Sequence, residues 1–110
     1  MSLNTAQLTQ DMVAAFQGVF VKKWPEIKEY AETEAKKMAQ SLAMIEVLSI
    51  SGKINAAQAA LHLEIQKNAT RMVFLTLEGL GILTAEAAMN AALNVVKESV
   101  NTALGFSLIN

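Results

Sequence analysis

Cysteine is absent from this chain of 110 residues, and histidine occurs once, as His62. Without cysteine there is no disulfide framework, no thiolate metal site and no thiol redox chemistry. One histidine cannot supply a zinc site within one chain. The residue three before it is Ala59, so the Glu-x-x-His motif of di-iron helical bundles is missing as well. We therefore expect no metal site and no cofactor.

Catalytic groupings are equally scarce. Asp11 is the only aspartate, and no glycine-rich phosphate loop is present. Glu64 follows His62 by two residues, a spacing that points the two side chains about 200° apart on a helix. No serine, histidine and acid can be assembled with any specificity. We expect no catalytic or cofactor-binding residues, and a protein that is not an enzyme.

Charge is sparse for a soluble domain. Charged residues amount to 17% of the chain, against about 25% in typical soluble domains, and nine of the nineteen lie within residues 22–37. The net charge of −1 and the glutamates among these lysines leave no basic surface for nucleic acid. The longest apolar tract, 72–85, is broken by Glu78 and two glycines and is shorter than the ~20 residues of a spanning helix.

The start of the sequence has no lysine or arginine before Lys22, and Asp11 interrupts its apolar residues. This pattern does not resemble a signal peptide. We expect a protein of the cytoplasm that does not enter a membrane.

Apolar residues recur with a helical period, and start signals punctuate them. Asn4 followed by Gln7 and Asn55 followed by Gln58 fit capping boxes, and Thr84 gives a weaker cap. Short connections favour antiparallel neighbours. The sequence predicts a single all-α domain spanning 1–110, either a four-helix up-down bundle or two helical hairpins completed by oligomerisation, with helices near 5–22, 25–50, 56–78 and 85–104.

The third predicted helix carries an apolar stripe at helical spacing, which we expect to face the core. A charged face lies opposite it. The expected core residues are Leu61, Ile65, Ala69, Met72, Thr76 and Leu80, and the expected charged residues are Glu64, Lys67, Arg71 and Glu78.

The second and fourth predicted helices carry more apolar surface than one bundle encloses. Residues 42–50 are apolar on all sides apart from Glu46, and the fourth helix has only a narrow polar arc. A helix that is apolar all round is normally enclosed on all sides. We expect a partner there, with interface candidates Trp24, Met44, Glu46, Val47, Ile50, His62, Val96, Val100 and Phe106.

These observations predict a non-enzymatic structural or assembly protein that self-associates through helices 2 and 4. One alternative is an adaptor or inhibitor-type module that docks a partner helix. A less favoured alternative is a membrane-active hairpin formed by 72–96. A plain monomer is also open, because neutral polar residues could solvate its surface. The tail 106–110 is apolar enough to dock on its own bundle or on a neighbour's.

Overall fold

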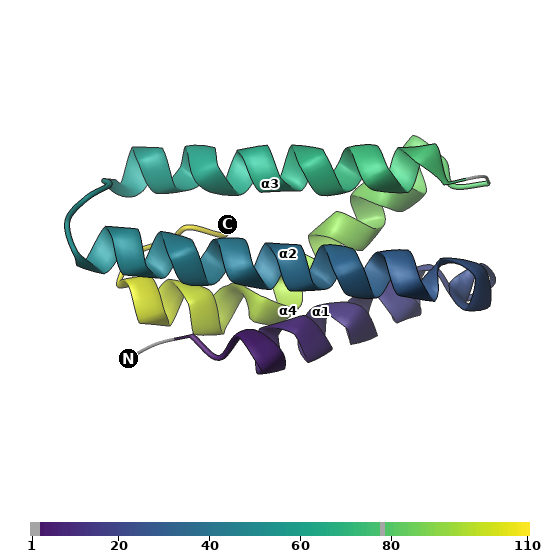
Figure 1. Ribbon diagram of the computed structural model, residues 1–110, viewed down its shortest axis with the longest axis horizontal. Helices are drawn as coiled ribbons and strands as arrows, with labels where there is room; N and C mark the ends of the chain where they lie inside the picture. Colours follow the sequence, from purple (N-terminus) through teal and green to yellow (C-terminus); the bar gives the residue numbers. More distant parts are fainter. Residues whose placement is uncertain (1–2, 78) are drawn as a thin grey trace.

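Four antiparallel helices make up most of the part of the chain that the structure describes. The computed structural model describes residues 3–77 and 79–110, and it measures 42 × 22 × 20 Å. The helices run alternately in opposite directions along its long axis (Figure 1), which confirms the predicted all-α bundle. They are α1 (Thr5–Val19), α2 (Trp24–Ile50), α3 (Ala56–Thr76) and α4 (Ile82–Leu104).

The helix starts follow local capping chemistry. Asn4 accepts a hydrogen bond from the Gln7 N–H at 3.0 Å, which satisfies one free amide of the first turn. Asn55 and Gln58 form the complete reciprocal capping box at the start of α3. Both N-caps were predicted from the sequence and are confirmed, but the box predicted at Asn4 is incomplete, because the Gln7 side chain donates to Asp11 instead of reaching back to the cap.

Two of the predicted helix boundaries were wrong, and a third is not tested. Gly81, not Thr84, is the N-cap of α4, because the backbone is extended at Gly81 and its carbonyl already accepts the Ala85 N–H at 3.0 Å. The first helix was predicted three residues too long, since it ends at Val19. The predicted end of the third helix at residue 78, and Glu78 in its charged face, lie outside the described residues.

The core is one continuous cluster to which all four helices contribute. α1 packs against both α2 and α4, whereas α3 packs mainly against α2. In Figure 1, α4 starts beside the end of α3 and then diverges from it to lie next to α1. The largest fully buried side chains are Phe16, Phe74, Met12, Met38, Leu42, Ile45 and Met89.

The tail docks on its own bundle. Gly105 has a φ of 80°, a left-handed conformation that suits glycine and ends α4. The chain then turns back, and the Asn101 side chain holds it with three hydrogen bonds: Oδ1 accepts from the Leu108 and Ile109 amides, and Nδ2 donates to the Ile109 carbonyl. Leu108 and Ile109 are buried.

We predict that Asn101→Ala releases this tail. The loss of three hydrogen bonds is expected to lower the free energy of unfolding by about 1–3 kcal/mol, measured by urea denaturation. Hydrogen exchange at the Leu108 and Ile109 amides should become faster.

The matched control is Asn94→Ala. Asn94 lies on the same helix, is exposed, and makes no side-chain hydrogen bond within residues 3–77 and 79–110. Equal unfolding midpoints for the two variants would show that Asn101 does not hold the tail.

Candidate interaction surface

The inner face of α3 is anchored by one aromatic side chain. Phe74 is fully buried and meets Phe16 and Phe20 of the α1 end edge-on, with ring centroids 5.2 and 5.1 Å apart. Edge-on aromatic contacts at this spacing add to the gain from burial alone. The rotation of α3 about its own axis therefore follows from where Phe74 fits.

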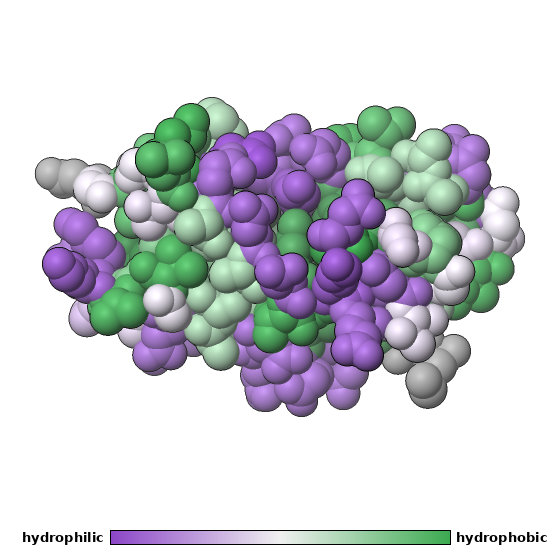
Figure 2. All heavy atoms as spheres, turned by 180° about the vertical axis from the view of Figure 1, so that it is seen from behind, coloured by the Kyte–Doolittle hydropathy of each residue, from purple (hydrophilic) through white to green (hydrophobic). Residues whose placement is uncertain are grey.

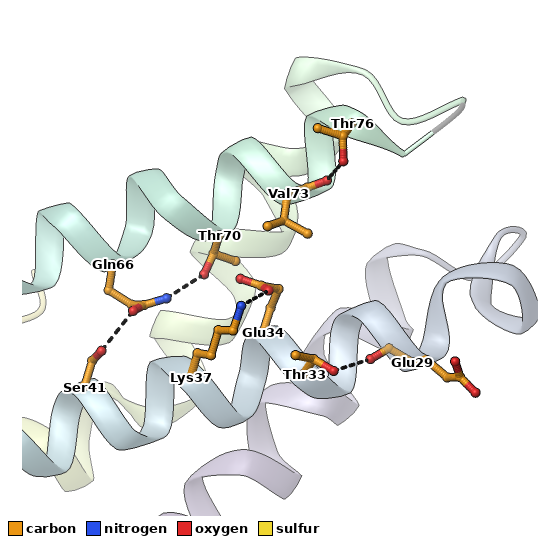
Figure 3. Close-up of polar contacts among 9 residues, drawn as sticks. All are labelled: Glu29, Thr33, Glu34, Lys37, Ser41, Gln66, Thr70, Val73 and Thr76. Atoms are coloured by element: carbon orange, nitrogen blue, oxygen red, sulfur yellow. Dashed lines mark hydrogen bonds and ion pairs between the residues drawn. The ribbon is translucent and has the colours of Figure 1, made fainter.

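A polar seam joins the rest of this inner face to α2. The Ser41 hydroxyl donates to Gln66 Oε1 at 3.0 Å, and Gln66 Nε2 donates to the fully buried Thr70 hydroxyl at 3.1 Å. Figure 3 shows this chain of contacts running between the two helices, with the Glu34–Lys37 ion pair of 3.3 Å beside it. Glu34 is itself buried. Since these polar groups are satisfied where they lie, the seam fixes the register of α3 on α2.

The outer face of α3 is apolar and open to solvent. Leu61, Ile65 and Met72 are 64%, 68% and 62% exposed. Together with the exposed Asn68 between them, they form what we term the outer ridge of α3. These three side chains were predicted to face the core, and that prediction was wrong, as it was for the exposed Ala69 and Thr76. Leu80, which follows the helix, is half-buried against the core.

The error arose because α3 has two apolar stripes. The second consists of Ala59, Leu63, Thr70 and Phe74, and it is this one that is buried. Its small residues permit a close approach to α2, and its Phe74 fills the space beside Phe16. The position of Phe74, the largest apolar side chain of α3, on this stripe is the sequence signal that would have identified the inner face.

The flank of α3 next to α4 carries charge. Glu64 pairs with Lys67 at 3.6 Å. The Arg71 guanidinium lies between two partners, with Nε next to Glu86 of α4 and Nη1 donating to Asn68 of the outer ridge. The predicted charged face of α3 therefore lies beside the ridge and towards α4.

The second half of α2, expected from its sequence to be enclosed by a partner, is exposed on one side and buried on the other. Three interface candidates are exposed: Met44, Val47 and Ile50. Glu46 is buried, and its Oε1 accepts a hydrogen bond from the Leu3 N–H at 2.7 Å. Glu46 thus ties the start of the chain to α2 and does not face outwards.

The wide apolar arc of α4 is covered by the chain's own helices, which corrects the expectation that it faces a partner. Val96 is 1% exposed and Val100 is fully buried. α4 packs along α1, and this contact covers the arc. α4 is instead apolar at its start, where Ile82 and Leu83 are exposed.

Seen from behind, the surface has apolar areas towards both ends and a mostly polar band across the middle (Figure 2). One of the apolar areas lies over the start of α4, at the upper left of that view. The remaining candidates, Trp24, His62 and Phe106, are half-buried. Trp24 and Phe106 pack against the core.

A groove of about 500 Å³ separates α3 from α4 and the tail. Ala60, Glu64 and Lys67 line its α3 side, and Asn90 and Asn94 line its α4 side. Within residues 3–77 and 79–110, no three His, Asp or Glu side chains gather as metal ligands would. Among the helices described, none has the length and apolar character needed to cross a bilayer.

Comparison of the chain with models of protein families, with curated proteins and with solved structures finds no match.

We predict that Phe74→Ala destabilises the bundle strongly. Removal of a fully buried ring from the Phe16–Phe20 contact leaves a cavity and is expected to cost about 3–5 kcal/mol of unfolding free energy. Leu83→Ala, a truncation of an apolar side chain that is 82% exposed, should cost less than about 0.5 kcal/mol. Chemical denaturation of both variants checks this. Similar costs would mean that Phe74 does not anchor α3.

Proposed function

We propose that this chain is a non-enzymatic structural subunit that assembles with copies of itself through the outer ridge of α3 and the adjoining end of α2. Neither nucleic acid nor a membrane is a partner in this proposal. The location in the cytoplasm that we expect from the sequence stays a prediction.

The observation that carries the proposal is the exposure of the outer ridge. Single exposed apolar residues are ordinary on protein surfaces. Leu61, Ile65 and Met72, however, share one line along α3 about 16 Å long, and each leaves more than half of its surface in water. An exposed line of large apolar side chains, interrupted here only by Asn68, is typical of protein contacts.

The end of α2 extends this surface. The Ser41–Gln66 hydrogen bond sets the register of the two antiparallel helices, so Met44, one turn further along α2, lies level with the residues around Leu63. On the helical wheel Met44 points outwards on the side of α2 that adjoins α3. Its 49% exposure adds apolar area on the side of α2 that adjoins α3.

The adaptor hypothesis uses the same surface but fits it less well. Modules that capture a partner helix usually offer a groove between two elements. Here the apolar residues stand on the crest of one helix, a shape suited to packing against an equal helix. The membrane-hairpin hypothesis is weaker still, because most of the apolar α4 residues it needs, from Ala85 to Val96, are buried in the core, although Ile82, Leu83 and Val95 are exposed.

We predict that Ile65→Lys dissociates the assembly without unfolding the subunit. A lysine in the centre of the ridge places an unpaired charge in the contact. The mass by sedimentation equilibrium should fall to 11.9 kDa, the mass of one chain, while circular dichroism stays helical.

Val21→Lys is the matched control. Val21 is also 68% exposed and also β-branched, but it lies in the turn between α1 and α2. This variant should keep the mass of the unaltered protein. The proposal fails if the unaltered protein is a monomer at all concentrations, in which case a monomer that binds an amphipathic helix would support the adaptor hypothesis.

A further inference from the structure

We infer that the occupant of the outer ridge is the α3 helix of a second copy of this chain, packed antiparallel about a two-fold axis. Leu61 of each copy then contacts Met72 of the other. This inference rests on the proposed self-association and specifies its geometry.

The spacing of the ridge favours helix pairing. Leu61, Ile65, Asn68 and Met72 are successively four, three and four residues apart. This alternation is the one by which two helices interlock side chains along a common seam. In an antiparallel arrangement, the Leu61–Met72 contact sets Ile65 of each copy against Asn68 of the other.

The charges beside the ridge select this register. Glu64 and Arg71 each precede a ridge residue by one position, so they share the same flank of α3. In an antiparallel pair, each flank faces the same flank of the second copy. The Leu61–Met72 register then brings Glu64 of each copy opposite Arg71 of the other, which gives two symmetric ion pairs.

Neighbouring registers are unfavourable. A shift of seven residues in one direction places Glu64 against Glu64 of the second copy, and the opposite shift places Arg71 against Arg71. A parallel pair sets Glu64 opposite Ala69 and Arg71 opposite Thr76, with no ion pair. Like charges across such a seam oppose pairing, and opposite charges set partner orientation.

Glu64 is open to a second copy, whereas the Arg71 side chain is only 22% exposed and reaches the ridge at its guanidinium end. Glu64 has 55% of its side chain exposed, and it borders the open groove beside α4. Arg71 already reaches the ridge, where it donates to Asn68. Because a guanidinium has five N–H donors, it can hold Glu86 of its own chain and Glu64 of the second copy together.

Asn68 contributes specificity. It is the only polar side chain of the ridge, and polar residues within a helical seam fix register and orientation at some cost in stability. Facing Ile65 near the two-fold axis, its amide stays in contact with Arg71. A shifted pair would lose the Leu61–Met72 contacts as well as the ion pairs.

A charge exchange tests the flank contacts. Glu64→Arg alone sets arginine against Arg71, and Arg71→Glu alone sets glutamate against Glu64. Each variant is expected to raise the dissociation constant by roughly tenfold or more. An equal mixture restores opposite charges on both sides, so a heterodimer of about 24 kDa, twice 11.9 kDa, should form. A mixture no heavier than its components overturns the inference, provided that both variants are helical.

Arg71→Glu also loses its contact with Glu86. A second test, with pairs of introduced cysteines, therefore examines the register without relying on that variant, and it holds even if the variant unfolds. The chain has no cysteine, so introduced thiols report without background. Under mild oxidation, a mixture of Leu61→Cys and Met72→Cys should give the mixed disulfide, identified by mass spectrometry. Neither protein alone should crosslink efficiently.

The outcomes separate this inference from the proposed function. Efficient crosslinking of Leu61→Cys with itself would indicate a parallel pair and overturn the inference. If the mixture of Leu61→Cys and Met72→Cys gives no crosslink while the unaltered protein sediments as an oligomer, the inference is also overturned, but self-association through another face is left standing. A monomeric unaltered protein would overturn both.

Discussion

The contact of Phe74 with Phe16 and Phe20 determines how α3 is rotated, and the surface of the molecule depends on that rotation. α3 has two apolar stripes, and only one can face α2 and α1. Burial of the aromatic ring favours the stripe of Ala59, Leu63, Thr70 and Phe74. The other stripe, with Leu61, Ile65 and Met72, is consequently left in water. The apolar surface left on α3 is thus a consequence of how Phe74 packs in the core.

The polar seam between α2 and α3 supports the same arrangement. Ser41, Gln66 and Thr70 satisfy one another in the seam, so a rotated α3 would lose both hydrogen bonds and leave the Ser41 hydroxyl of α2 without its partner. The aromatic contact therefore favours one rotation, and the seam opposes the alternatives. Assembly through the outer ridge requires no change in this fold. In the assembly that we propose, a second copy would cover what the core leaves exposed, and Glu64 and Arg71 would limit the orientations in which it could do so.

Local sequence signals predicted the helices well, because capping is decided by a few neighbouring residues. The Asn4 and Asn55 caps and the exposure of Met44, Val47 and Ile50 agree with the structure. The faces of α3 and α4 were not predictable in the same way. Which α3 stripe is buried depends on the rings of Phe16 and Phe20, at the end of α1 and far away in the sequence. The burial of Val96 depends on α1 packing along α4, which no pattern within α4 itself encodes.

Intermolecular contacts between the outer ridges test the central claim most directly. Equal amounts of isotope-labelled and unlabelled chain can be mixed and examined by isotope-filtered nuclear Overhauser spectroscopy. We expect cross-peaks between the Met72 methyl group of one copy and the Leu61 methyl groups of the other. Intermolecular cross-peaks that involve only other surfaces, or none at any concentration, would contradict the account.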